Sequence, residues 1–178
     1  DKESSLGFHA SGRNSGVMHA GFYYTSDSLK SKFTREGNAT IRQYCKDKKL
    51  QINECGKLVV CKNDTDFKGL DELEKRAKYN NVELHKISEK EAKKIEPRVI
   101  TNRVALWSPT TFSINPIQVM ESLLSDALGL GIKVVTDTRY LHSNRNNKII
   151  VTSKGNYNYG YFINSAGLYA DKIAIEWG

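Results

Sequence analysis

The segment at residues 9–21 reads HASGRNSGVMHAG and is the most informative part of this chain. Its three glycines lack a Cβ, so a planar ligand or a phosphate can approach the main chain closely. Ser11, Asn14 and Ser15 add hydroxyl and amide groups that can donate and accept hydrogen bonds there. The same spacing also occurs in glycine-rich surface loops, so a purely structural loop stays open as the alternative. We interpret the segment as a ligand-binding loop.

The composition is typical of a globular protein, with 39% hydrophobic and 26% charged residues in a chain of 178. The net charge of +7 could attract nucleic acid, an anionic membrane or an anionic substrate. The lysines, however, are spread along expected helices, and no stripe of interleaved basic and aromatic residues is present. The charge therefore favours a solvated surface, and a basic nucleic-acid-binding module is kept only as a remote alternative.

The cysteines and histidines indicate neither a disulfide framework nor a metal site. Cys45, Cys55 and Cys61 form no CxxC pair and are odd in number, which predicts free thiols in a reducing compartment. The four histidines show no grouping with acids or thiols that would bind a metal ion. No apolar run approaches the roughly 18 residues of a membrane span, and no signal peptide opens the chain. A cytoplasmic location is expected.

Periodicity and capping residues predict an alternation of helices and strands. Helices are expected from a cap at Ser26 or Asp27, over 66–79, from a capping box of Ser88 and Glu91 to Pro97, from Asn115, and after Gly167. Strands are expected over 58–61, 103–107, 132–136, 140–142 and 148–152, with a turn at 144–147. This alternation predicts an α/β or mixed α+β architecture.

Two of the expected helices carry an apolar stripe that should be buried. In the helix after Asp27 the stripe is Leu29, Phe33, Ile41, Tyr44 and Cys45, and Gly37 lies on it. The small Gly37 should let this helix approach its neighbour closely. In the helix from Asn115 the stripe is Met120, Leu123, Leu124, Ala127 and Leu128.

Four motifs resemble, in the same order along the chain, those of FAD-dependent oxidoreductases. They are NSGVMHAGFYY and the following SLK within 14–30, CGKLVV at 55–60, WSPTTFSINP at 107–116 and INSAGLYAD at 163–171. The chain is similar to the D-amino-acid-oxidase-like superfamily and, within it, to the L-2-hydroxyglutarate oxidase/dehydrogenase family. Together the motifs cover nearly the whole chain.

The resemblance implies part of a FAD/NAD(P)-binding Rossmann-like domain with an inserted substrate domain of mixed or antiparallel sheet. Residues 1–50 and 115–178 are expected to belong to the FAD-binding domain, and 51–114 to the substrate domain. In the family, the first domain opens with a strand, a GxGxxG turn and a helix, which would precede Asp1. We therefore expect an internal segment of a longer enzyme that is inactive by itself.

The resemblance implies FAD as the cofactor. Asp1 falls on the acidic position that accepts hydrogen bonds from the adenosine ribose, and the main chain at Arg139 would meet adenine. The flavin and diphosphate would lie along Ser11, Gly12, Arg13, Asn14, Ser15 and Gly16. The segment that closes the FAD site would be Ser165, Ala166 and Gly167. Arg13 stands where relatives often have His, and it either neutralises phosphate charge or faces solvent.

The substrate side of the site is expected to contain His19, Lys57, Thr110 and Thr111. His19 would pass the flavin ring, where a neutral imidazole can act as a base; a buried, hydrogen-bonded structural histidine is the alternative. Lys57 could pair with a substrate carboxylate or be an ordinary surface lysine. Thr110, Thr111 and Ser113 would lie in a loop facing the substrate. Phe112 follows, where relatives usually carry Gly.

The implied activity is FAD-dependent oxidation of an L-2-hydroxy acid, by hydride transfer to flavin N5. The substrate favoured is L-2-hydroxyglutarate, giving 2-oxoglutarate, with oxygen or a quinone as the electron acceptor. The alternatives are an amino-acid or sarcosine-type oxidase and a relative of glycerol-3-phosphate dehydrogenase. A peripheral contact with the inner membrane face is left open.

Overall fold

The computed structural model describes residues 1–178, which form two units. The central unit is Ser15–Asn115, and the split unit combines Asp1–Asn14 with Pro116–Gly178. Each is described by itself below.

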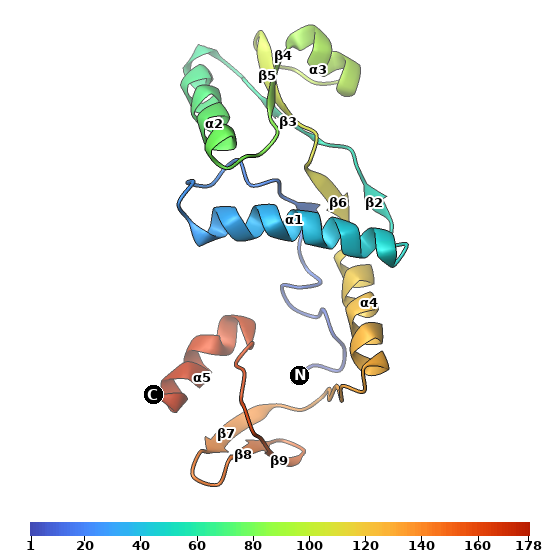
Figure 1. Ribbon diagram of the computed structural model, residues 1–178, viewed down its shortest axis with the longest axis vertical. Coiled ribbons are helices and arrows are strands. Elements are labelled where there is room, and N and C mark those ends of the chain that lie inside the picture. The colour runs from blue at the N-terminus through green and yellow to red at the C-terminus, as the bar shows by residue number, and fades with distance from the viewer. The chain divides into compact units, whose positions relative to one another are not determined.

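Two antiparallel sheets form the strands of the central unit (Figure 1). The first has the order β3-β5-β4, with β3 at Lys57–Val60, β5 at Val104–Ser108 and β4 at His85–Ser88. The second has the order β1-β6-β2, with β1 at Val17–Met18, β6 at Phe112–Ile114 and β2 at Ile52–Asn53. Because β5 and β6 are central in their sheets and separated only by residues 109–111, that short link fixes one sheet to the other.

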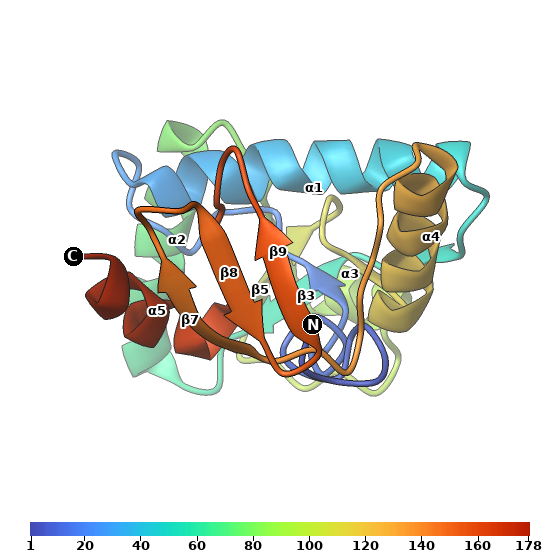
Figure 2. The ribbon, with the colours of Figure 1, turned by 90° about the horizontal axis from the view of Figure 1, so that it is seen from below.

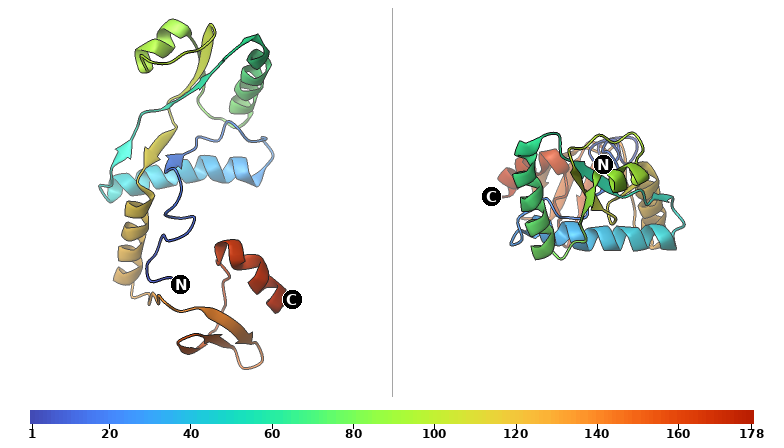
Figure 3. Two further views of the ribbon diagram at one scale, coloured as in Figure 1. Left: turned by 180° about the vertical axis from the view of Figure 1, so that it is seen from behind. Right: turned by 90° about the horizontal axis from the view of Figure 1, so that it is seen from above.

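Three helices accompany these sheets. Helix α1 (Leu29–Asp47) lies beside the second sheet, as the view from behind shows (Figure 3). Helix α2 (Phe67–Tyr79) follows the 3-10 turn η1 (Asp64–Asp66), and helix α3 (Glu89–Ile95) follows β4 directly.

The core of the central unit lies between α2 and the first sheet. Leu70 of α2 packs with the fully buried Leu106 of β5 and with Cys61. A second cluster joins Ala77 of α2 to Phe22, in the segment that follows the glycine-rich loop. Burial of these apolar side chains stabilises the contact between α2 and both segments.

The split unit contains helix α4 (Pro116–Gly129), a three-stranded meander and helix α5 (Ala170–Trp177). The meander has the order β7-β8-β9, and its strands span Tyr140–Asn144, Ile149–Thr152 and Gly155–Asn158 (Figure 2). The 3-10 turn η2 (Gly167–Tyr169) leads into α5. The Trp177 ring stacks on Phe162 at 4.5 Å, and its indole N–H donates to the Tyr140 hydroxyl at 3.1 Å. These contacts fix α5 to the meander.

The local predictions are largely confirmed. Helix α2 covers 67–79, α4 begins at Pro116, and β3, β5, β7 and β8 lie at the expected positions. The capping box is present: Ser88 Oγ accepts from the Glu91 N–H, and the Glu91 carboxylate accepts from the Ser88 N–H. The mixed α/β class is also confirmed.

Three local predictions were wrong. The cap of α1 is Ser28, whose hydroxyl accepts from the Ser31 N–H at 3.1 Å, and not Ser26 or Asp27. Residues 132–136 form no strand, because they have no extended partner beyond isolated hydrogen bonds between 135–138 and 1–3. Ser113, expected in a loop, lies in β6.

The predicted buried stripes were mostly wrong. In α1, Cys45 is fully buried as expected, but Leu29 and Phe33 are 69% and 61% exposed, and no residue of α4 is buried. The face that α1 turns toward the sheet is polar: the Arg42 guanidinium lies 4.6 Å from the centre of the Phe112 ring. No atom lies within 4 Å of where a Cβ of Gly37 would be, so this glycine mediates no close helix approach.

Candidate functional site

The glycine-rich segment forms a loop closed by its own hydrogen bonds. The His9 carbonyl accepts from the N–H groups of Gly12, at 3.1 Å, and Arg13, at 3.0 Å. The Asn14 side-chain amide donates to the carbonyls of Ala10 and Ser11, both at 3.0 Å. The N–H groups of Gly12 and Arg13 are therefore used to shape the loop, and the groups presented outward are exposed side chains.

Two of its glycines are required by the backbone. A Cβ at position 12 would overlap the Gly7 carbonyl and the Ile117 side chain, so only glycine fits there. Gly16 is buried and has φ +67, a conformation that side chains disfavour. This loop therefore needs glycine at both positions, whereas a surface turn of arbitrary sequence would not.

The chemistry of these residues fits a dinucleotide cofactor. Ser11 and Ser15 are exposed hydroxyls, and the exposed Arg13 guanidinium lies 4.5 Å from the centre of the Phe8 ring. A guanidinium of this kind can bind phosphate oxygens. The Asp1 carboxylate accepts from the Glu3 N–H through Oδ1 at 2.9 Å and is exposed, as an acceptor of ribose hydroxyls must be.

The other predicted cofactor residues lie in the split unit. The Arg139 N–H donates to the Ser153 hydroxyl, and its carbonyl accepts from the Ser153 N–H, both at 2.9 Å. These two bonds hold the main chain that is expected to meet adenine, and the carbonyl oxygen keeps a second acceptor site. Ser165 is exposed, the Ala166 N–H donates to Asn164 Oδ1, and Gly167 has φ +56 at the start of η2.

His19 directly follows β1 and has an exposed side chain between two buried neighbours, Met18 and Ala20. This alternation is that of an extended segment with one face inward. Partial burial of the imidazole lowers the pKa of His19 below its ordinary 6.5, and the positive charges of Lys57 and Lys30 lower it further. The imidazole is therefore neutral at pH 7, as a general base requires.

Lys57 is the first residue of β3 and is half-buried. Its ammonium lies 4.6 Å from the centre of the Tyr23 ring. A cation at this distance over an aromatic face is attracted by the ring, which restricts where the ammonium can lie. Lys57 is thus held in place and also acts electrostatically on His19.

Asn38 organises the segments around His19, and the sequence interpretation missed it. Its side-chain N–H groups lie within hydrogen-bond distance of the carbonyls of Met18 (3.1 Å), His19 (3.2 Å) and Thr110 (3.0 Å). The available signal was an Asn in the middle of a helix, where its side chain usually competes with the backbone. Asn38 joins the His19 segment to the Thr110 loop.

The two predicted threonines are placed differently. Thr110 is half-buried and connected to His19 through Asn38. The Thr111 hydroxyl lies 2.9 Å from the Ser108 hydroxyl, and both residues are buried. Thr111 shapes the link between the sheets, whereas Thr110 is the more accessible of the two.

The segment after His19 is fixed to the end of α2. The Asn80 amide donates to the carbonyls of Gly21 at 3.0 Å and Tyr24 at 2.9 Å, and Arg76 donates to the Tyr23 carbonyl at 2.9 Å. Asn80 itself is only 2% exposed. The main chain that presents both tyrosine rings is therefore held at several points.

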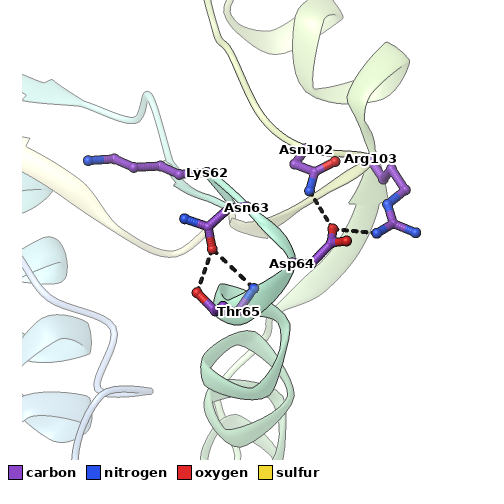
Figure 4. Close-up of a pocket in the computed structure, with 6 residues that line it drawn as sticks. All are labelled: Lys62, Asn63, Asp64, Thr65, Asn102 and Arg103. Atoms are coloured by element: carbon purple, nitrogen blue, oxygen red, sulfur yellow. Dashed lines mark hydrogen bonds and ion pairs between the residues drawn. The ribbon is translucent and has the colours of Figure 1, made fainter.

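A separate open pocket lies at the start of η1 (Figure 4). Its lining residues are Lys62, Asn63, Asp64, Thr65, Asn102 and Arg103. Arg103 and Asn102 both donate to Asp64 and lower the pKa of its carboxyl group. Since the carboxylate is already paired with residues of its own pocket, and no predicted site residue is present, this pocket is not the candidate site.

The structure thus groups His19, Lys57 and Thr110 within the central unit, where Ser15 and Gly16 also lie. Asp1, Ser11–Asn14, Arg139 and residues 165–167 belong to the split unit. None of the helices combines the length and apolar content needed to cross a membrane.

The alternation of helices with antiparallel strands, the glycine-dependent loop and the histidine that follows it together fit a nucleotide-binding oxidoreductase. The model of the FAD dependent oxidoreductase family matches residues 1–176, and the chain belongs to this family, whose cofactor is FAD. Among the relatives that it resembles are L-2-hydroxyglutarate dehydrogenases. The mitochondrial protein of Mus musculus is 33% identical over 189 residues, which cover 98% of this chain and 40% of that protein. The Escherichia coli (strain K12) protein is 28% identical over 181 residues, covering 100% of this chain and 43% of that protein.

The fold is shared with solved structures of the same kind. The L-α-glycerophosphate oxidase of Mycoplasma pneumoniae, with FAD bound, superposes with a TM-score of 0.84 at 22% identity, covering 99% of this chain and 49% of that one. The predicted resemblance is confirmed, and the chain spans about two fifths of the length of the curated relatives it matches.

Proposed function

We propose that this chain is part of an enzyme that oxidises an L-2-hydroxy dicarboxylate, L-2-hydroxyglutarate, to the 2-oxo acid 2-oxoglutarate with FAD. The observation that carries the proposal is a neutral His19 within electrostatic reach of the cationic Lys57, in a chain similar to L-2-hydroxyglutarate dehydrogenases. Such a site pairs a base with a carboxylate-binding cation, which are the two groups that a hydroxy acid requires.

FAD would be held by the residues that the sequence predicts. The Asp1 carboxylate would accept from the ribose hydroxyls, and Arg13 would neutralise phosphate charge beside Ser11, Gly12, Asn14, Ser15 and Gly16. Residues 165–167 and the main chain at 139 would complete the site. When bound, FAD supplies the redox chemistry as the acceptor of the hydride that leaves the substrate C2 carbon.

His19 would take the proton of the substrate hydroxyl. As the C2–H bond breaks, the oxygen–hydrogen electron pair becomes the second bond of the new carbonyl, and the proton moves to an imidazole nitrogen. A general base must be unprotonated at the working pH to accept a proton. The lowered pKa of His19 meets this condition.

Lys57 would orient the substrate by pairing with a carboxylate, and Thr110 would contact it from the loop joined to His19 by Asn38. Thr111 would support this loop through Ser108. We retain the assignment of 1–50 and 115–178 to the FAD-binding domain and of 51–114 to the substrate domain as part of the proposal. Oxygen or a quinone would reoxidise the flavin at a cytoplasmic site, with a peripheral membrane contact in the quinone case.

The test is anaerobic reduction of the holoenzyme. We expect L-2-hydroxyglutarate to bleach the flavin absorbance band, whereas D-2-hydroxyglutarate, glycine and sarcosine leave it unchanged. Reoxidation by oxygen and by a soluble quinone, followed separately, identifies the acceptor. An enzyme that is not reduced by L-2-hydroxyglutarate but is reduced by an amino acid would contradict the proposal.

A glycerol-3-phosphate oxidoreductase is the second candidate. It is favoured by the fold shared with L-α-glycerophosphate oxidase and by the same lysine, which would bind a phosphate as well as a carboxylate. Glycerol 3-phosphate is therefore included among the reductants, and bleaching by it alone would select this candidate. The family match favours either enzyme over a nucleic-acid-binding module.

A further inference from the structure

We propose that Lys30 is a second carboxylate-binding residue, which acts with Lys57 as a lysine pair that recognises both ends of a dicarboxylate. This inference rests on the proposed function and extends it from one carboxylate to two. The sequence interpretation quoted Lys30 as the last residue of the SLK motif but assigned it no role.

The two lysines are arranged in the same way on adjacent tyrosines. The Lys57 ammonium lies 4.6 Å from the centre of the Tyr23 ring, and the Lys30 ammonium lies 4.6 Å from the centre of the Tyr24 ring. The carbonyls of Tyr23 and Tyr24 are held by α2 and its cap, through Arg76 and Asn80. Both ammonium groups are thus placed by one anchored segment.

The charges of both lysines reach His19, the proposed base. Lys57 and Lys30 are the two groups whose positive charge disfavours protonation of this imidazole. The first turn of α1, which contains Lys30, lies against the segment after His19, because the Ser31 carbonyl oxygen is 3.7 Å from where a Cβ of Gly21 would be.

Neither ammonium has a carboxylate partner in the chain. Lys86 pairs with Asp71 and Glu74, and Lys93 pairs with Glu89, but no ion pair involves Lys30 or Lys57. Both cations are therefore available to an anionic ligand, and a dianion bound to the two would neutralise both. A monocarboxylate or a single phosphate ester supplies one anionic group for two cations.

The test compares Lys30→Gln with Lys32→Gln in the holoenzyme. Lys32 lies in the same turn and is exposed but is not among the residues that act on His19. We expect Lys30→Gln to raise the KM for L-2-hydroxyglutarate by roughly 10- to 100-fold, the size of a lost charged hydrogen bond, with kcat nearly unchanged. For the monocarboxylate L-2-hydroxybutyrate the KM should not change, and Lys32→Gln should match the wild type with both substrates.

Two further variants keep the result interpretable. Lys30→Arg retains the charge and should restore most of the affinity, while Lys30→Glu should abolish selection of the dicarboxylate. An equal loss with both substrates, or the same loss in Lys32→Gln, would overturn the assignment of Lys30 while leaving the proposed function intact. A wild-type holoenzyme that L-2-hydroxyglutarate does not reduce would overturn both.

Discussion

The side-chain amide of Asn38 and the main-chain carbonyl of Thr110 form a hydrogen bond of 3.0 Å that joins positions 72 residues apart. The same amide reaches the carbonyls of Met18 and His19. One side chain in the middle of α1 therefore positions the proposed base relative to the loop that would face the substrate.

Replacing Asn38 by Ala should destabilise the protein by about 1–3 kcal/mol, because carbonyls that are partly buried lose their donor. The midpoint of urea unfolding measures this loss. Gln43→Ala, on the exposed surface of the same helix, removes only the bond to Asp47 and should cost about 0.2–0.5 kcal/mol. Equal losses in the two variants would show that Asn38 has no special structural role.

Gly56→Ala should be strongly destabilising. Gly56 has φ +64, and a Cβ there would overlap the Trp107 indole, so both the backbone and the ring must shift. We expect a loss of about 2–3 kcal/mol, typical of an overpacked site. Gly69→Ala is the matched control: Gly69 lies in α2 with nothing within 4 Å of the new methyl group, so the variant should gain about 1 kcal/mol. A loss of stability in both variants would show that the cost does not come from the backbone and the Trp107 ring at position 56.

His19→Ala should lower kcat of the holoenzyme by about 10²- to 10⁴-fold, the usual contribution of a general base, while FAD stays bound. Flavin absorbance per protein measures occupancy, and anaerobic flavin reduction measures the chemical step. The control is His85→Ala, since His85 is an exposed histidine of β4 paired with Glu83. Unchanged turnover in His19→Ala would remove this residue from catalysis.

The pH dependence should follow the ionisation of His19. Its pKa lies below 6.5, so kcat/KM should be constant near neutral pH and fall only as the pH drops through this lowered value. The unfolded chain binds the proton more readily than the folded one, so the free energy of unfolding also falls as the pH drops below 6.5.

Lys57→Gln should raise the pKa of His19, because one of the two nearby positive charges is removed. Burial is the larger cause and remains, so the pKa should still lie below its ordinary value. The acid limb of kcat/KM and the NMR titration of the His19 ring should both move to higher pH. The control is Lys62→Gln, in the pocket of Figure 4, which should leave the pKa of His19 unchanged. A change of this pKa in Lys62→Gln, or no change in Lys57→Gln, would refute the electrostatic effect of Lys57 on His19.

Features that depend on neighbouring residues in the chain could be predicted from the sequence. The capping box of Ser88 and Glu91 requires only a spacing of three residues, and the start of α4 at Pro116 requires only the fixed φ of proline. The strands β3 and β5 are long enough for their apolar pattern to be recognised. The second sheet could not be predicted, because β1 and β2 have only two residues each and therefore show no periodicity.

The sequence by itself determined the family, the glycine-dependent loop and the positions of His19 and Lys57, because these reside in short motifs of fixed spacing. Only the tertiary structure decided that α1 turns a polar face toward the second sheet. It also decided that the Thr111 hydroxyl lies within hydrogen-bond distance of the Ser108 hydroxyl, and that Asn38 holds the His19 segment. It also brought Lys30 into electrostatic reach of the proposed base. The physical reason is that burial and long-range hydrogen bonds depend on which distant segments meet, and the local pattern of a helix or loop does not contain that information.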